Sequence, residues 1–132
     1  MNQEDLKTLR KAQQGELDAV LMYQALADTV RDTNDAETFK RLAAEEGHHA
    51  SVFKNLTNQT LQPKKTLAIL LPILYRLLGK KRLYPFIAKA EYAAVNTYAP
   101  VAERFPEILC VKEDEKRHGD TVIALLNSST GR

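Results

Sequence analysis

The sequence predicts an all-α fold: a four-helix bundle in which a long crossover joins the second helix to the third and contains an extra short helix. Three observations support it. Four long segments place apolar residues at alternating steps of three and four, the spacing of a helix that packs along one seam. The links within the first and second pairs of segments are short, whereas the middle link is long. The two halves of the chain also repeat each other.

The first long helix is expected from about residue 3 to 31 and the second from about residue 35 to 58. The link "RDTNDAE" between them offers Thr33, Asn34 or Asp35 as the cap of the second helix. The inward positions of the first helix are Leu6, Leu9, Gln13, Glu16, Val20, Tyr23, Ala27 and Val30. Those of the second are Phe39, Leu42, Glu46, His49, Phe53 and Leu56.

The crossover starts with the polar connector "TNQTLQPKK" and continues into "TLAILLPILYRLLG", which is apolar on nearly every side. About a dozen residues is short of the roughly 20 that span a bilayer, and Pro72 predicts a short or kinked helix. We expect residues 66–79 to be covered by the bundle or by a second subunit. Docking on a membrane surface through 66–82 remains the alternative, because basic residues border the stretch: Lys64, Lys65, Arg76, Lys80, Lys81 and Arg82.

"KKRLYP" is expected to break the chain, and the third long helix is expected to begin near Pro85, since proline is favoured at the first helical position. Pro100 should bend this helix, and Pro106 should open the fourth. The third seam comprises Tyr84, Ile87, Glu91, Ala94, Tyr98, Val101 and Phe105. The fourth comprises Ile108, Val111, Glu115, His118, Val122 and Leu125.

The repeat between the halves coincides with the seams. "ELDAVLMY" (16–23) aligns with "EYAAVNTY" (91–98), and "EEGHH" (45–49) aligns with "DEKRH" (114–118). A two-helix unit used twice explains both matches.

Two overlapping Glu-x-x-His pairs lie in the second helix, and the seam distinguishes them. Glu46 and His49 continue the apolar seam, whereas Glu45 and His48 lie about 100° around the helix and should face solvent or the edge of the interface. In the fourth helix the same test selects the pair at 115 and 118 and leaves Glu113 and Asp114 outside. Together with the seam glutamates of the first and third helices, the inward polar set is Glu16, Glu46, His49, Glu91, Glu115 and His118.

A buried carboxylate costs several kcal/mol unless it is neutralised, and four that converge would also repel one another. Two divalent cations would balance the four charges. Glu and His three residues apart lie on one face of a helix, so each such helix can hold a metal at two points. Carboxylate oxygens with one imidazole per metal suit iron or manganese better than a closed zinc site. The sequence therefore predicts a dinuclear metal centre.

These motifs, with "AEEGHHASVF" and "EDEKRHGD", resemble the di-iron carboxylate site of the ferritin-like superfamily and most closely that of rubrerythrin. The resemblance covers the four long helices but not residues 59–83. It implies two iron ions (Fe²⁺/Fe³⁺), with manganese or zinc as possible substitutes. It also implies bridging roles for Glu46 and Glu115, terminal roles for Glu16 and Glu91, and nitrogen ligation by His49 and His118. Tyr23 and Tyr98 resemble tyrosines that hydrogen-bond such ligands.

The implied function is that of a di-iron oxidoreductase that reduces peroxide or dioxygen with electrons from an external donor protein, as in defence against oxidative stress. Rubrerythrins usually carry a further carboxylate three residues after the third-helix glutamate, where this chain has Ala94. Ferroxidase or other iron-handling activity is the alternative, followed by a metal-loaded sensor and a membrane-associated di-iron hydroxylase.

Length and composition place further bounds. A chain of 132 residues fits a single domain, 1–132. A net charge of +2 gives no reason to expect a nucleic-acid partner. The single cysteine, Cys110, excludes an internal disulfide and a CxxC-type metal site, and we expect it to be buried or half-buried. The polar N-terminus is not expected to be a signal peptide, so we expect a cytoplasmic protein, and the apolar crossover suggests a homodimer.

Overall fold

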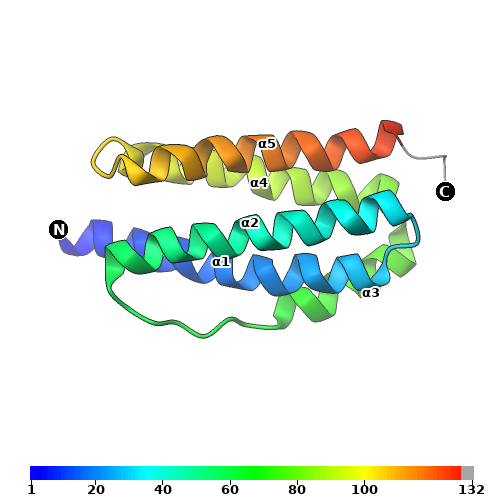
Figure 1. The fold of residues 1–132 in the computed structure, drawn as a ribbon, viewed down its shortest axis with the longest axis horizontal. Coiled ribbons are helices and arrows are strands. Elements are labelled where there is room, and N and C mark those ends of the chain that lie inside the picture. The colour runs from blue at the N-terminus through cyan, green and yellow to red at the C-terminus, as the bar shows by residue number, and fades with distance from the viewer. Residues whose placement is uncertain (129–132) are drawn as a thin grey trace. The chain divides into compact units, whose positions relative to one another are not determined.

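The computed structural model describes residues 1–128, and over that range the chain forms five α-helices and no strand (Figure 1). The helices are α1 (Gln3–Thr29), α2 (Thr33–Thr57), α3 (Thr66–Leu78), α4 (Lys80–Ala102) and α5 (Glu107–Ser128). The predicted all-α class and the extra helix in the crossover are confirmed. The chain forms two compact units, residues 1–73 and residues from 74 onward. A single domain would require these two units to pack on one core, and that stays a prediction.

In the first unit, α1 and α2 lie side by side (Figure 1). Asn2 caps α1 by accepting a hydrogen bond from the Asp5 amide at 2.7 Å. Asp32 caps α2 in the same way, accepting from the Asp35 amide at 3.0 Å. The predicted cap at residues 33–35 was therefore wrong by at least one residue, because Asp32 already satisfies a free amide of the first turn.

The seam predicted for α1 and α2 forms the apolar core of this unit. Leu9, Phe39 and Phe53 are fully buried. The rings of Tyr23 and Phe39 stack with their centroids 5.7 Å apart. Three predicted seam positions are less buried than expected, since Leu6, Val20 and Leu56 are half-buried.

The connector between α2 and α3 is held against α1 by side chains of α1. Buried Gln13 donates to the carbonyl of Gln59 at 2.8 Å and accepts from the Thr57 hydroxyl at 2.6 Å. Asp18 accepts from the Lys64 amide at 2.7 Å. The bonds to Gln59 and Lys64 satisfy backbone groups of a segment that has no secondary structure of its own, and they hold that segment against α1.

The predicted break at "KKRLYP" was wrong, because α4 begins at Lys80 and runs through Pro85. Only Gly79 separates α3 from α4, and its φ of +78° is a conformation that glycine adopts readily. Buried Leu83 and Tyr84 anchor the turn ahead of the proline. Burial therefore outweighs the preference of proline for the first helical position.

In the second unit, α4 and α5 lie side by side (Figure 1), joined by the short link at residues 103–106. The fourth helix begins at Glu107, one residue after Pro106, as predicted. Every predicted seam residue of α5 is buried. Cys110 is exposed, contrary to prediction, because it lies between the seam positions 108 and 111. Among the described helices, none is long and apolar enough to cross a membrane.

Candidate metal centre

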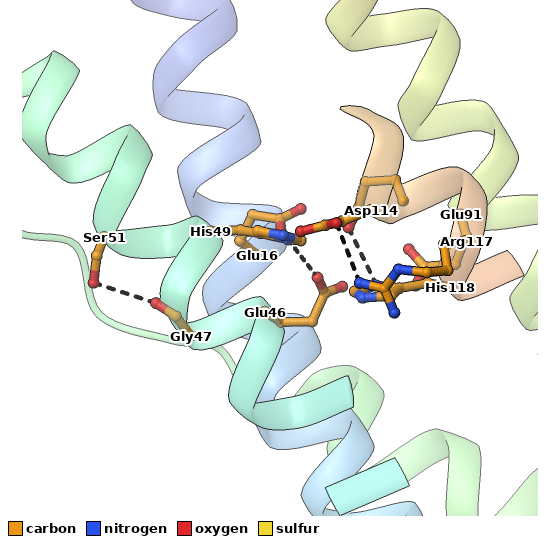
Figure 2. Close-up of polar contacts among 10 residues, drawn as sticks. Glu16, Glu46, Gly47, His49, Ser51, Glu91, Asp114, Arg117 and His118 are labelled. Atoms are coloured by element: carbon orange, nitrogen blue, oxygen red, sulfur yellow. Dashed lines mark hydrogen bonds and ion pairs between the residues drawn. The ribbon is translucent and has the colours of Figure 1, made fainter. Parts of the chain in front are cut away.

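The first unit gathers one carboxylate from α1 and a carboxylate and an imidazole from α2. The Nδ1 atom of His49 lies 3.0 Å from Oε1 of Glu16 and 2.9 Å from Oε1 of Glu46 (Figure 2). The three side chains are at most 4% exposed. The three-residue spacing in α2 brings Glu46 and His49 to the same face, and the packing of α1 adds Glu16.

The second unit repeats this arrangement. The Nδ1 atom of His118 lies 3.2 Å from Oε2 of Glu91 and 3.4 Å from Oε1 of Glu115. His118 and Glu115 come from α5 and Glu91 from α4, and all three are buried. The sequence repeat is therefore a repeat of side-chain geometry as well.

The acidic and histidine side chains next to these sets lie outside the core. His48 and Glu113 are exposed, and Glu45 is half-buried. Asp114 is half-buried and forms an ion pair with Arg117 at 3.1 Å (Figure 2). The heptad test thus separates buried from outer side chains correctly. Whether the buried residues bind metal stays a prediction.

Each set has the chemistry and spacing of a metal site. Two donor atoms at about 2.1 Å from one ion and at right angles lie about 3 Å apart, close to the separations found around each Nδ1. Within each set, one ligand atom from every residue lies within 4.8 Å of the others. Two carboxylates and one imidazole suit iron or manganese. The residues present therefore fit a divalent ion in each unit.

Burial changes the acid–base chemistry of the second set. It raises the pKa of Glu91 from its ordinary value of 4.5 to about 7, against the opposing effect of a hydrogen bond with His118. Desolvation penalises the ionised carboxylate. A metal cation bound at this position would stabilise the ionised form of the Glu91 carboxylate and displace its proton.

The two tyrosines predicted to support the ligands are both buried, Tyr23 at 0% and Tyr98 at 5% exposure. Tyr23 packs on Phe39 in the core. Their proposed hydrogen bonds to metal ligands stay predictions.

Sequence reasoning missed a contact directly beside the second set. Tyr92, which follows Glu91, donates its hydroxyl to Oδ1 of Asp120 at 2.6 Å, and Lys116 binds the other oxygen of that carboxylate at 3.2 Å. The bond to Asp120 raises the pKa of Tyr92 to about 12. A Cβ atom on Gly119 would overlap the Tyr92 ring, with Cδ1 and Cζ at 2.8 Å. A glycine inside the α5 seam pattern was the available signal for such a close approach.

Replacing Gly119 with alanine is expected to destabilise the protein by about 1 kcal/mol, because the Tyr92 ring must leave its place and its bond to Asp120. The control is Gly15→Ala, since nothing lies within 4 Å of a Cβ there; it should stabilise by about 0.5–1 kcal/mol. Urea denaturation measures both. In a Tyr92→Ala background the cost of Gly119→Ala should disappear, and a persistent cost would show that the ring is not its cause.

Comparison with known proteins agrees with this architecture. The sequence model of the rubrerythrin family matches residues 7–126, which include all five helices in whole or in large part. Searches of curated proteins and of solved structures found no match. The predicted ferritin-like fold class is supported by the helices and by this match together. The chain belongs to the rubrerythrin family.

Proposed function

We propose that the two Glu–Glu–His sets act as one dinuclear centre and that the protein is a non-haem di-iron oxidoreductase that reduces peroxide or dioxygen. The observation that carries the proposal is the repeated set itself: in each unit two buried carboxylates lie 2.9–3.4 Å from the Nδ1 atom of a buried histidine. The family match over 7–126 covers both sets and supports their joint use.

The proposed roles are those that the resemblance to rubrerythrin implies for each residue. Glu46 and Glu115, which share a helix with a histidine ligand, would lie between the two ions. Glu16 and Glu91 would each bind one ion from the neighbouring helix. His49 and His118 would bind through Nδ1, the atom that faces the carboxylates in both units.

Two bound ferrous ions would supply the two electrons that convert peroxide and two protons into two waters. The chain's own contribution is to hold six donors in place and to exclude water from them, since each side chain is at most 8% exposed. At pH values below about 7, Glu91 carries a proton in the metal-free protein. Re-reduction requires an external electron-donor protein, and manganese or zinc could replace iron.

The test is to load the metal-free protein anaerobically with two ferrous ions per chain and to mix it with peroxide or with dioxygen. We expect near-ultraviolet absorption to appear faster with peroxide, and oxidation to stop at two irons per chain. Failure to bind iron would contradict the whole proposal. If the iron-loaded protein reacted with neither oxidant, the proposed oxidoreductase activity would be excluded, and the function of a metal-loaded sensor would remain.

Ferroxidase activity is the second candidate, and Ala94 is the observation that favours it. This half-buried residue lies one helical turn from Glu91 and offers no carboxylate, so the second set has fewer acidic groups than is usual in rubrerythrins. Oxidation of many ferrous ions per chain, with ferric product leaving the site, would support this reading over peroxide reduction. Ala94→Glu should then shift activity toward peroxide.

A further inference from the structure

Helix α3 exposes large apolar side chains along its whole length. Ile69 is 62% exposed and Leu77 is 75% exposed. The exposed apolar set on this helix is Leu67, Ile69, Leu70, Ile73, Leu77 and Leu78. Only Leu71 and Pro72 are buried. Large apolar side chains exposed together on one short helix are typical of a binding face.

Along the sequence, the charges that flank α3 are all of one sign, although Asp18 of α1 lies close to its start and accepts from the Lys64 amide. Residues 47–90 contain eight of the 19 basic residues of the chain and none of its 17 acidic residues. The rest of the chain therefore holds eleven basic and 17 acidic residues and is net negative. Lys64 and Lys65 precede α3 and are exposed, as are Arg76 within it and Lys81 and Arg82 after it. The apolar helix is thus bordered by cations at both ends.

This charge pattern favours an anionic lipid surface over a second copy of the chain as the partner of α3. A second copy of the chain docked helix to helix through α3 would bring the same cations together, and residues 47–90 provide no carboxylate to pair with them. Anionic lipid headgroups would neutralise these cations, while apolar side chains enter the layer beneath. At about 1.5 Å per residue, the 13 residues of α3 extend about 20 Å, too short to span a bilayer but long enough to lie along its surface.

We infer that α3 docks this protein on the surface of an anionic lipid bilayer, with its exposed leucines and isoleucines in the acyl boundary and its flanking lysines and arginines at the phosphates. The inference does not depend on the proposed redox function, because the docking face shares no residue with the Glu–Glu–His sets.

Co-sedimentation of the full-length protein with vesicles tests the inference. We expect binding to vesicles of phosphatidylcholine with 30% phosphatidylglycerol, and little binding to phosphatidylcholine alone. The variant Lys80→Gln/Lys81→Gln/Arg82→Gln should bind about a hundredfold more weakly, since each cation near the surface contributes about a factor of five. The matched control Lys7→Gln/Arg10→Gln/Lys11→Gln removes the same charge from exposed positions of α1 and should bind within twofold of wild type.

The apolar contribution has its own pair of variants. Ile69→Gln/Leu77→Gln should weaken vesicle binding at least tenfold, because it removes the two most exposed side chains of α3. Leu109→Gln, on α5 and 45% exposed, should bind as wild type does. An environment-sensitive dye at Leu77→Cys, in a Cys110→Ser background, should shift to the blue on anionic vesicles, whereas the dye at Lys11→Cys should not.

Three outcomes would overturn the inference. One is the absence of binding to anionic vesicles. Another is equal weakening by both triple variants, which would indicate attraction to the whole protein rather than to α3. The last is a wild-type dimer, measured by light scattering, that Ile69→Gln/Leu77→Gln converts to a monomer without vesicle binding by either protein. In that case α3 is an interface between copies of the chain.

Discussion

Replacing His49 with alanine is expected to weaken iron binding at least a hundredfold, whereas replacing the adjacent His48 should leave it unchanged. Mutation of a residue that only orients a metal ligand lowers metal affinity tenfold to a hundredfold. Removal of a direct ligand should lower it at least as much. The two histidines share a helix, a residue type and a Glu-x-x-His spacing. They differ in exposure, since His49 is 1% exposed and His48 is exposed.

Titration of metal-free protein with ferrous iron under anaerobic conditions measures the stoichiometry and the affinity. Wild type and His48→Ala should bind two ions per chain, and His49→Ala should retain one at most. If His48→Ala lost iron binding to the same extent, the heptad test would have failed to separate ligand from outer side chain. Circular dichroism of each variant separates loss of ligand from loss of fold.

The variant Glu46→Ala, titrated in the same way, distinguishes one dinuclear centre from two independent metal sites. If the two sets act together, removal of this carboxylate from the first set should also alter the spectrum of iron held by His118 and its partners. Two independent sites would instead leave half of the iron with its original affinity and spectrum. The latter result would contradict the dinuclear proposal while leaving both sets intact as metal sites.

The sequence was sufficient to identify the six buried glutamate and histidine side chains because an α-helix converts spacing into direction, although the buried Asp5 and Asp35 lie off the predicted seams. Glu46 and His49 continue the steps that begin at Phe39, and all three are buried in the structure. The neighbouring Glu45 and His48 have the same chemistry but a different phase. Periodicity therefore carried the information that residue type alone did not.

The sequence was less informative where long-range packing competes with local preference. Proline is favoured at the start of a helix, so Pro85 was expected to begin α4, yet the helix starts at Lys80 because buried residues ahead of the proline anchor its first turn. The contact of Tyr92 with Gly119 depends on the alignment of α4 with α5, which seams do not determine to within one residue. Neither feature could be derived from spacing along a single helix.

The second large effect concerns Glu91 in the metal-free protein. Between pH 5 and pH 8 the free energy of unfolding should fall by about 2–3 kcal/mol because of this residue. Its pKa is about 7 in the folded protein and 4.5 ordinarily, so over most of this range the folded state binds a proton that the unfolded state has released. Stability that depends on this proton is present at low pH and is lost as the pH rises toward and through 7.

Urea denaturation of metal-free protein at pH 5 and pH 8 tests this prediction. Glu91→Gln cannot ionise and should lose this part of the pH dependence, while Glu113→Gln, which removes an exposed carboxylate of α5, should retain it. An unchanged dependence in Glu91→Gln would assign the effect to other groups. The same proton competes with metal, so iron binding by the wild type should weaken as the pH falls below 7. The burial that makes Glu91 costly in the metal-free protein would thus make this site responsive to both metal and pH.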